Sequence, residues 1–403
     1  MGTRGTGQGK TGAVPAHQPD IMTIPYDFID SNDALIRLAR RLATQSVIAV
    51  DLEADSMHHF HEKVCLVQVA ANGINAVVDP LAVGHLAPLS SLLADPGIRK
   101  VFHGADYDVR SLYRDFGIEI NNLFDTQVAA VFTGRTETGL DAVVSHYFDV
   151  HLDKRFQKKD WARRPLPDEM VAYAASDAIY LISLAEKLIA ELQALGRLEW
   201  VLEECRLLSR VRPDTGDPQP LFLKCKGAGT LDRRSLAVLE GLLQFRRAMA
   251  EKKDRPPFKV MSTQSLLKIA TAKPRDLNAL GALKAISDRQ MNRLGQGVVA
   301  AVKEAMKLPA SALPLYPRKR APRLPRMAPE RIRRLKLWRD AEAARLGLDP
   351  SVVSTKAQIT EVAVLNPATV KDLNRCELLK RWQIDSFGED MVAAMGKRPG
   401  RKR

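Results

Sequence analysis

The chain has 403 residues, a formal net charge of +14 and 45% hydrophobic residues, so it is long and apolar enough to bury more than one core. No apolar run reaches the ~18 to 20 residues of a membrane span, and residues 1–20 lack the apolar stretch of a signal peptide. We therefore expect a cytoplasmic protein of two or three domains with no membrane partner. The four cysteines have neither zinc-site nor disulfide spacing, which favours ordinary buried thiols.

The charge is divided unevenly along the chain. Residues 21–205 carry a net −10, whereas residues 206–310 carry +12 and residues 311–403 carry +11. The block from Arg318 to Arg339 holds ten basic residues and one acid, Glu330. An acidic front followed by two basic segments suits an enzyme whose appendages hold a polyanion, so nucleic acid is the expected partner.

The first twenty residues are polar without periodicity and are expected to be a disordered tail. Short runs rich in valine and isoleucine at 47–52, 64–70, 74–79 and 100–103 predict strands of one buried sheet. Helical spacing follows, first up to Gly117 and then from Thr126, Leu140 and Asp168. Strands followed by helices around them predict an α/β domain.

Turn-forming segments and the change to helical spacing divide the rest of the chain. Between and after the two linkers the pattern is helical only. The expected organisation is a tail at 1–20, an α/β domain at 21–205, a linker at 206–229, a helical domain at 230–308, a basic linker at 309–326, a second helical domain at 327–396 and a basic tail at 397–403.

An internal repeat with a period of 93 residues relates the two helical segments. Arg246 and Arg339 each follow an aromatic residue and start the two copies. The matched pairs after them are Pro257/Pro350, Val260/Val353, Leu266/Ile359, Ile269/Val362, Pro274/Pro367 and Gly295/Gly388. The pattern indicates a duplicated helical module.

Asp51 and Glu53 stand two residues apart at the end of a predicted strand, so both carboxylates point to the same side. Two ionised carboxylates in this position repel each other unless a cation compensates them. Solvation at the strand end is the alternative.

Asp108 lies just inside the helix that follows His103, two residues after Asp106. Helix capping is the expected role of Asp106. At Asp108 the helix dipole favours a carboxylate in any case, so charge alone does not separate a metal ligand from a bystander.

Tyr173 and Asp177 are four residues apart in a predicted helix and share one face. Small residues beside them leave space. The hydrophobic periodicity does not explain an aspartate on a face that also carries Met170 and Leu181.

Together, a strand Asp-x-Glu, an aspartate at a helix start and a helical Tyr-x-x-x-Asp resemble the DEDD exonuclease superfamily and its tyrosine branch, the ribonuclease D family. The similarity covers nearly all of residues 21–205. The repeat resembles the HRDC domain. This resemblance implies a ribonuclease H-like 3′–5′ exonuclease domain followed by two all-α HRDC-like domains. It also implies that Asp51, Glu53, Asp108 and Asp177 hold two Mg²⁺ or Mn²⁺ ions, that Asp125 supports them and that Tyr173 orients the attacking water.

The resemblance further implies a 3′–5′ exoribonuclease that acts on RNA with a free 3′ end, by family analogy a transfer-RNA precursor, and releases nucleoside 5′-monophosphates. We expect a monomer. Stacking and phosphate contacts are typical of single-strand binding. The candidate substrate-binding residues are His58, Phe60, His103, Asp125, Lys158, Lys159, Trp161 and Arg163. The alternatives are loop residues at 58–61, a solvated basic helix start at 158–164 and, less favoured, a histidine metal cluster.

Three other functions share parts of this pattern. A DNA exonuclease would use the same carboxylates, but proofreading domains normally accompany a polymerase, for which the chain has no room. An inactive nucleic-acid-binding adaptor is disfavoured because all four acids are present. A helicase accessory protein would explain only the helical copies. The chain has no Gly-x-x-x-x-Gly-Lys-Ser/Thr loop, so we expect no nucleotide cofactor.

Overall fold

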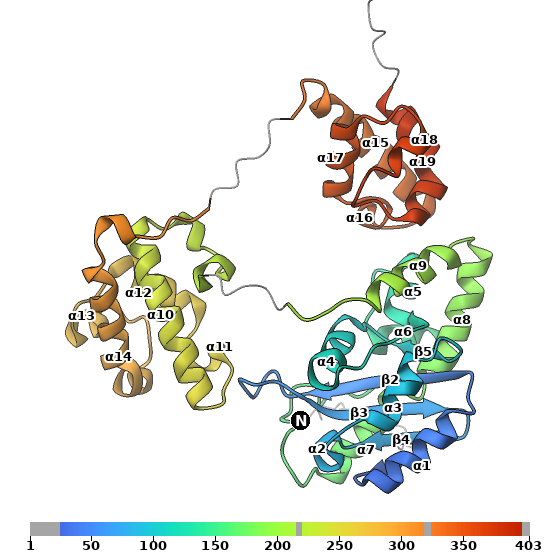
Figure 1. Cartoon of the computed structure of the whole chain (residues 1–403), viewed down its shortest axis with the longest axis horizontal. Helices are drawn as coiled ribbons and strands as arrows, with labels where there is room; N and C mark the ends of the chain where they lie inside the picture. The colour runs from blue at the N-terminus through green and yellow to red at the C-terminus, as the bar shows by residue number, and fades with distance from the viewer. Residues whose placement is uncertain (1–24, 215–219, 318–323, 397–403) are drawn as a thin grey trace, which may run out of the picture.

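The computed structural model describes residues 25–214, 220–317 and 324–396. The expected tails at 1–20 and 397–403 lie outside the described residues, as do Arg318, Lys319, Arg320 and Arg323 of the basic block. An α/β domain is followed along the chain by two all-helical domains, which confirms the expected fold class (Figure 1).

A six-stranded mixed sheet forms the centre of the α/β domain, with strand order β1-β4-β3-β2-β5-β6. The central strand β2 pairs antiparallel with β3 and parallel with β5. The strands are β1 (Asp27–Ile29), β2 (Val47–Ala54), β3 (Val64–Ala71), β4 (Ile74–Val78), β5 (Arg99–Phe102) and β6 (Leu123–Asp125). The four predicted strands are confirmed. The edge strands β1 and β6 have three residues each and were not predicted.

Helices pack around this sheet. Helix α4 starts soon after β5 and ends at Gly117, whose φ of +66° gives the left-handed turn that a glycine accepts without strain. The helices of this domain are α1 (Asn32–Leu42), α2 (Pro80–Val83), α3 (Ala87–Ala94), α4 (Asp106–Phe116), α5 (Thr126–Phe132), α6 (Leu140–Phe148), α7 (Asp168–Asp177), α8 (Leu181–Ala194) and α9 (Leu198–Leu208).

The first helical domain has a hydrophobic core of its own, built mainly from α10, α12 and α14. Its elements are the 3₁₀ turns η1 (Leu221–Lys224) and η2 (Ala228–Thr230), the helices α10 (Arg233–Lys252), α11 (Pro257–Val260), α12 (Thr263–Ala272), α13 (Leu277–Ala282) and α14 (Asp288–Lys307), and η3 (Ala310–Ala312). Phe222 packs into this core, so the domain begins within the expected linker at 206–229.

The second helical domain repeats the same helix order. It comprises α15 (Ala328–Leu346), α16 (Pro350–Val353), α17 (Lys356–Leu365), α18 (Val370–Leu373) and α19 (Arg381–Met395). Equivalent side chains make equivalent hydrogen bonds in the two copies. Arg246 donates to the Met261 carbonyl at 3.1 Å, and Arg339 donates to the Ser354 carbonyl at 3.4 Å. The sequence repeat is therefore also a structural repeat.

The second helical domain shares a continuous hydrophobic core with the α/β domain. Trp382 stacks on Trp200 with ring centroids 4.8 Å apart and lies edge-on to Phe132 at 5.4 Å. Arg197 donates to the carbonyls of Phe132 and Leu346, one in each domain, at 2.8 and 2.6 Å. These two domains are therefore packed as one body.

All four cysteines are buried free thiols. Within the described ranges, no helix is both long and apolar enough to cross a membrane.

Candidate active site

Strand β2 places Asp51 and Glu53 on one face of the sheet, because residues two apart on a strand point the same way. Burial raises the pKa of Asp51 to about 6. Burial, and then the charges of Asp51, Asp177 and Asp108, raise the pKa of Glu53 well above its usual range. The two carboxyls thus lie within a larger group of acids.

The other two acids come from helices. Asp108 lies in the first turn of α4 and Asp177 is the last residue of α7, and each is 8% exposed. Burial, and then the charges of Asp51 and Asp125, raise the pKa of Asp108. Burial and Asp51 also raise the pKa of Asp177 to about 8, although a hydrogen bond from Tyr173 opposes this. The sheet and two helices therefore bring four predicted acids into electrostatic contact.

Asp106, two residues before Asp108, has a different environment. It does not cap the helix as expected, since Ala105 is the N-cap residue and no side-chain cap is formed. Its carboxylate is exposed and accepts from Arg110 at 2.8 and 3.1 Å. This hydrogen bond lowers the pKa of Asp106. The structure therefore distinguishes the buried Asp108 of the acidic group from the exposed Asp106, which the sequence alone could not do.

Tyr173 lies one helical turn before Asp177 and is 6% exposed. Its ring stacks on Trp161 at 6.1 Å and meets Phe156 edge-on at 5.6 Å. Burial, and then the charges of Asp177 and Glu53, raise the pKa of the phenol, so it stays protonated at neutral pH. The packing fixes the ring beside the acids.

A cleft of about 410 Å³ opens over this group. Asp51, Glu53, Tyr173 and Asp177 line it, whereas the buried Asp108 does not. Its other lining residues are Leu52, His103, Gln127, Gly139, Leu140, Asp141, Leu152, Asp153, Lys154 and Gln157.

Lys154 is a cleft cation that the sequence analysis did not single out. It pairs with Asp141 at 2.9 Å. Its signal in the sequence was weak, because nothing distinguishes it from the other cations of the same basic segment, Lys158, Lys159 and Arg163.

His103 and Asp125 lie on the β5–β6 side of the site. His103 lines the cleft, and its Nδ1 is 2.9 Å from the hydroxyl of Thr126. Asp125 is fully buried and accepts from the backbone N–H groups of Gly104 and Ala105 at 3.0 and 2.7 Å. Asp125 therefore supports the turn that leads into α4, which carries Asp108.

The loop after β2 lies beside the first helical domain. His58 Nε2 donates to the Lys158 carbonyl at 2.9 Å. Phe60 packs against the hydrophobic core of the first helical domain. Neither residue lines the cleft.

The basic segment before α7 has two kinds of residue. Lys158, Lys159 and Arg163 are exposed and do not line the cleft. Trp161 is fully buried beneath Tyr173, so it presents no surface to RNA and instead supports the tyrosine. The basic neighbours of Trp161 predicted that it contacts RNA, and its burial corrects this prediction.

The acids fit a divalent cation in chemistry and charge. Hard carboxylate oxygens are the ligands that Mg²⁺ and Mn²⁺ prefer, and a cation would offset the mutual repulsion that raises these pKa values. Over the described ranges, however, no three His, Cys, Asp or Glu side chains are already arranged to hold a metal ion.

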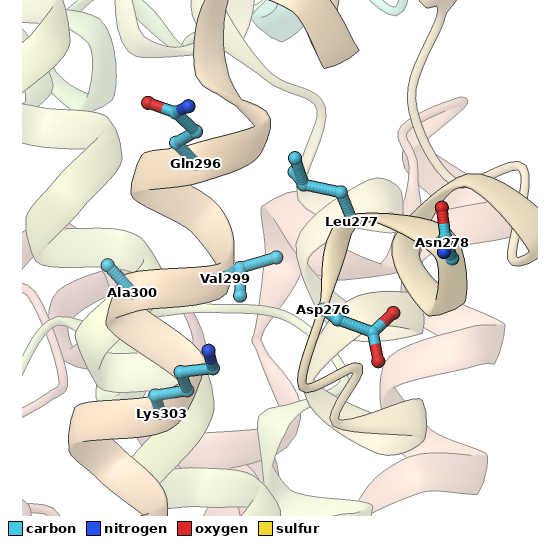
Figure 2. Close-up of a pocket in the computed structure, with 7 residues that line it drawn as sticks. All are labelled: Asp276, Leu277, Asn278, Gln296, Val299, Ala300 and Lys303. Atoms are coloured by element: carbon cyan, nitrogen blue, oxygen red, sulfur yellow. The ribbon is translucent and has the colours of Figure 1, made fainter.

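A larger cavity of about 550 Å³ lies on the first helical domain (Figure 2). It is lined by Asp276, Leu277, Asn278, Gln296, Val299, Ala300 and Lys303. Asp276 is occupied as the N-cap of α13, accepting from Ala279 N–H at 2.7 Å. With one acid and one lysine, this cavity lacks the chemistry of the acidic cleft.

The fold and the acidic cleft define the class of protein. Residues 26–193 match the 3′-5′ exonuclease family, and residues 235–302 and 328–395 each match the HRDC domain family. This chain is a 3′–5′ exonuclease with two HRDC domains.

Similar proteins narrow the class. Ribonuclease D of Gluconacetobacter diazotrophicus is 32% identical over 368 residues, 91% of each chain. Ribonuclease D of Escherichia coli is 32% identical over 290 residues, covering 72% of this chain and 77% of that protein. The crystal structure of E. coli RNase D superposes with a TM-score of 0.69 at 26% identity, covering 94% of this chain and all of the other. The catalytic core of RRP6 from Trypanosoma brucei gives a TM-score of 0.62 at 32% identity, covering 73% and 82%. The chain belongs to the ribonuclease D family and is a 3′–5′ exoribonuclease.

Proposed function

We propose that this enzyme trims free 3′ ends of RNA, including transfer-RNA precursors, and releases nucleoside 5′-monophosphates with the help of two divalent ions, Mg²⁺ or Mn²⁺. It would act as a monomer in the cytoplasm. The observation that carries the proposal is the set of four acids and Tyr173. They come from β2, α4 and α7, their charges raise one another's pKa, and all but the buried Asp108 line one cleft.

The four acids act as metal ligands. Asp51, Glu53 and Asp177 hold one ion, and Asp51 together with Asp108 helps to hold the second. Bound divalent ions would supply an activated water and neutralise the charge that builds on the phosphoryl oxygens. Asp125 keeps the start of α4 in place by accepting from the Gly104 and Ala105 N–H groups.

Tyr173 orients the attacking water. Its pKa is raised, so the phenol remains a hydrogen-bond donor at neutral pH and is no general base. The stacked Trp161 and edge-on Phe156 restrict its ring to one orientation. The phenol O–H bonds to Asp177, so its oxygen accepts from the water, and a fixed acceptor beside the acids lowers the entropic cost of placing that water in line with the scissile bond.

RNA would reach the cleft through residues at its rim. Lys154 and His103 line the cleft and would contact the terminal nucleotide. The exposed Lys158, Lys159 and Arg163 would contact phosphates further from the 3′ end. His58 and Phe60 are occupied at the boundary with the first helical domain, so base contacts there would require that loop to move.

A substrate panel tests the proposal. Purified full-length protein with Mg²⁺ is given single-stranded RNA or DNA, each with a free or a blocked 3′ end. We expect mononucleotides from free-ended RNA and none from blocked RNA. Cleavage of the blocked RNA would contradict exonucleolytic action, and equal cleavage of DNA would contradict the RNA assignment.

Two neighbouring aspartates provide a matched pair of variants. Asp108→Asn removes a buried acid of the cluster, and we expect activity to fall by at least about a hundredfold because charge neutralisation at the reacting phosphate is lost. Asp106→Asn, on the same helix, removes only an exposed ion pair with Arg110 and should retain activity within about twofold. Equal activity in both variants would show that Asp108 is not part of the active site.

Metal binding should appear in a pH-dependent melting temperature. The acids Asp51 and Asp177 have raised pKa values of about 6 and about 8, so without a cation the folded state loses stability as pH rises through them. A cation binds their ionised forms. Stabilisation by Mg²⁺ should therefore grow from about pH 5 to about pH 9, and should shrink in Asp108→Asn but not in Asp106→Asn. A Mg²⁺ effect that is absent or constant with pH would contradict the proposed site.

A further inference from the structure

The corner after α10 is where the first helical domain meets the loop that joins β2 to β3 (Figure 1). Asp254 forms this corner with a φ of +42°, an uncommon conformation for a residue other than glycine. Its Oδ1 accepts from the backbone N–H groups of Phe60 and His61 at 3.0 and 3.3 Å. Phe60 completes the contact by packing against the core of the helical domain.

His59 lies between two carboxylates in this contact. Its Nδ1 is 2.6 Å from Asp254 Oδ2 in the helical domain, and its Nε2 is 3.3 Å from Asp160 Oδ1 in the α/β domain. The imidazole is 24% exposed, so these two interactions are only partly screened by water. One ring therefore bridges the two domains.

On the side of the α/β domain, the backbone and the side chain of His59 each contact a segment that leads to the catalytic cleft. Its backbone N–H donates at 3.0 Å to the carbonyl of Asp55, which directly follows β2, the strand of Asp51 and Glu53. Asp160 precedes Trp161, whose ring stacks on Tyr173. The bridge thus holds the helical domain against the segments that form the cleft.

The number of protons on His59 decides how many bonds it can donate. A neutral imidazole has one N–H, whereas the imidazolium has two. Both carboxylates receive a hydrogen bond only when His59 is protonated. When it is neutral, a bare nitrogen lone pair faces one of the carboxylates, and that contact becomes repulsive.

The surrounding charges favour the protonated form. Desolvation opposes it, but the hydrogen bonds and charges of Asp254, Asp55 and Asp160 outweigh desolvation and raise the pKa of His59. Lys259 of the helical domain lies beside the neighbouring histidine, with its Nζ 3.4 Å from His58 Nδ1. A group whose pKa is raised on docking favours docking below that pKa and ceases to do so as pH rises through it.

We propose that His59 is a positioning residue whose protonated imidazole, bridging Asp254 and Asp160, docks the first helical domain beside the catalytic cleft and releases it as pH rises. The consequence for RNA rests on the proposed function, because this domain is basic and would hold RNA near the cleft. The docking equilibrium itself does not depend on catalysis.

Domain docking is measured by energy transfer in the full-length chain. Dyes are attached to Glu186→Cys on α8 and Arg289→Cys on α14, since the four native cysteines are buried. We expect high transfer near pH ~6 and lower transfer near pH ~9. The variant His59→Ala should show the low value throughout, whereas His85→Ala, an exposed histidine elsewhere in the α/β domain, should titrate like the parent.

Two further variants separate a proton-dependent bridge from a merely structural residue. In Asp160→Asn and Asp254→Asn, one charge that favours the imidazolium is removed, so the midpoint of the docking titration should shift to lower pH. A parent that does not titrate between about pH 6 and about pH 9, or a His59→Ala variant that stays docked, would overturn the proposal.

The same variants connect docking to RNA. At pH ~6, His59→Ala should raise KM for a long single-stranded RNA about tenfold, as expected for losing a hydrogen-bonded charge contact, with a much smaller change in kcat. An unchanged KM in an undocked variant would show that docking does not promote RNA binding. The conclusion that His59 docks the domain would still stand. If the parent hydrolyses no RNA, the proposed function fails, and the energy-transfer titration still tests the bridge.

Discussion

The first helical domain contacts the α/β domain through the polar groups of Asp254 and His59 and through Phe60, whereas the second shares a continuous hydrophobic core with that domain. The two copies nevertheless use the same corner of their fold. Position 254 in the first copy corresponds to position 347 in the second under the 93-residue repeat. It is Asp254 in one, where it accepts hydrogen bonds from the loop after β2, and Gly347 in the other.

At the second corner, the backbone itself makes the contact with the α/β domain. A Cβ on Gly134 of the α/β domain would lie 2.6 Å from the Gly347 carbonyl oxygen, so the two backbones touch. The Gly347 carbonyl therefore leaves no room for a side chain at Gly134. The first copy is thus attached through the bridge proposed to respond to pH, and the second through backbone and ring contacts.

A second repeat position shows the same division. Trp382 in the second copy corresponds to Arg289 in the first. Trp382 is 4% exposed and packs on Trp200, whereas Arg289 is exposed to solvent. An aromatic residue at this position therefore contributes to the shared core in the second copy and is replaced by an exposed cation in the first.

The largest effect is expected from Trp382→Ala. Removing this ring leaves a cavity at the contact with Trp200 and Phe132, which should lower the free energy of unfolding by about 3 to 5 kcal/mol. Arg289→Ala, at the matched position, should change it by less than about 0.5 kcal/mol. Urea denaturation of both variants measures the difference. Equal stability of the two variants would show that the second domain is not part of the shared core.

The sequence predicted the repeat but not how its copies attach. The spacing of prolines, valines and leucines is local to each module and visible in one dimension. Docking depends on pairs far apart in the chain, such as Asp254 with His59 and Trp382 with Trp200. No periodicity signals such pairs. The short strands β1 and β6 were missed for a related reason, since three residues are too few to show alternation.

An intermediate effect is expected from Asp254→Gly, which gives the first copy the residue of the second. The change removes the acceptor of three hydrogen bonds to the β2–β3 loop, and docking of the first domain should weaken by about 1.5 to 3 kcal/mol. The melting temperature of the shared core should not fall, because that core does not contain this contact. Energy transfer and calorimetry report the two quantities separately. A fall in both would mean that the first domain also supports the core.

The candidate site was predictable in its acids and less so in its surroundings. The order of the four acids and Tyr173 carried a family resemblance, although each acid alone was ambiguous. Trp161 was a candidate substrate-binding residue because lysines and arginines flank it, yet the fold buries it under Tyr173. The sequence did not distinguish Lys154, because one basic segment supplies both this cleft cation and the cations outside the cleft. Only the three-dimensional path of the chain separates them.

The smallest effect is expected from salt. The bridge through His59, Asp254 and Asp160 is partly exposed, so raising ionic strength to about 1 M should weaken docking of the first domain by about 0.2 to 1 kcal/mol. Packing of Phe60 against the helical core is apolar and should limit the loss. The second domain should respond less, because the Trp200, Trp382 and Phe132 rings pack beside its ion pair between Lys380 and Glu204. Energy transfer that rises with salt would show that the apolar contact of Phe60, and not the charged bridge, holds the first domain in place.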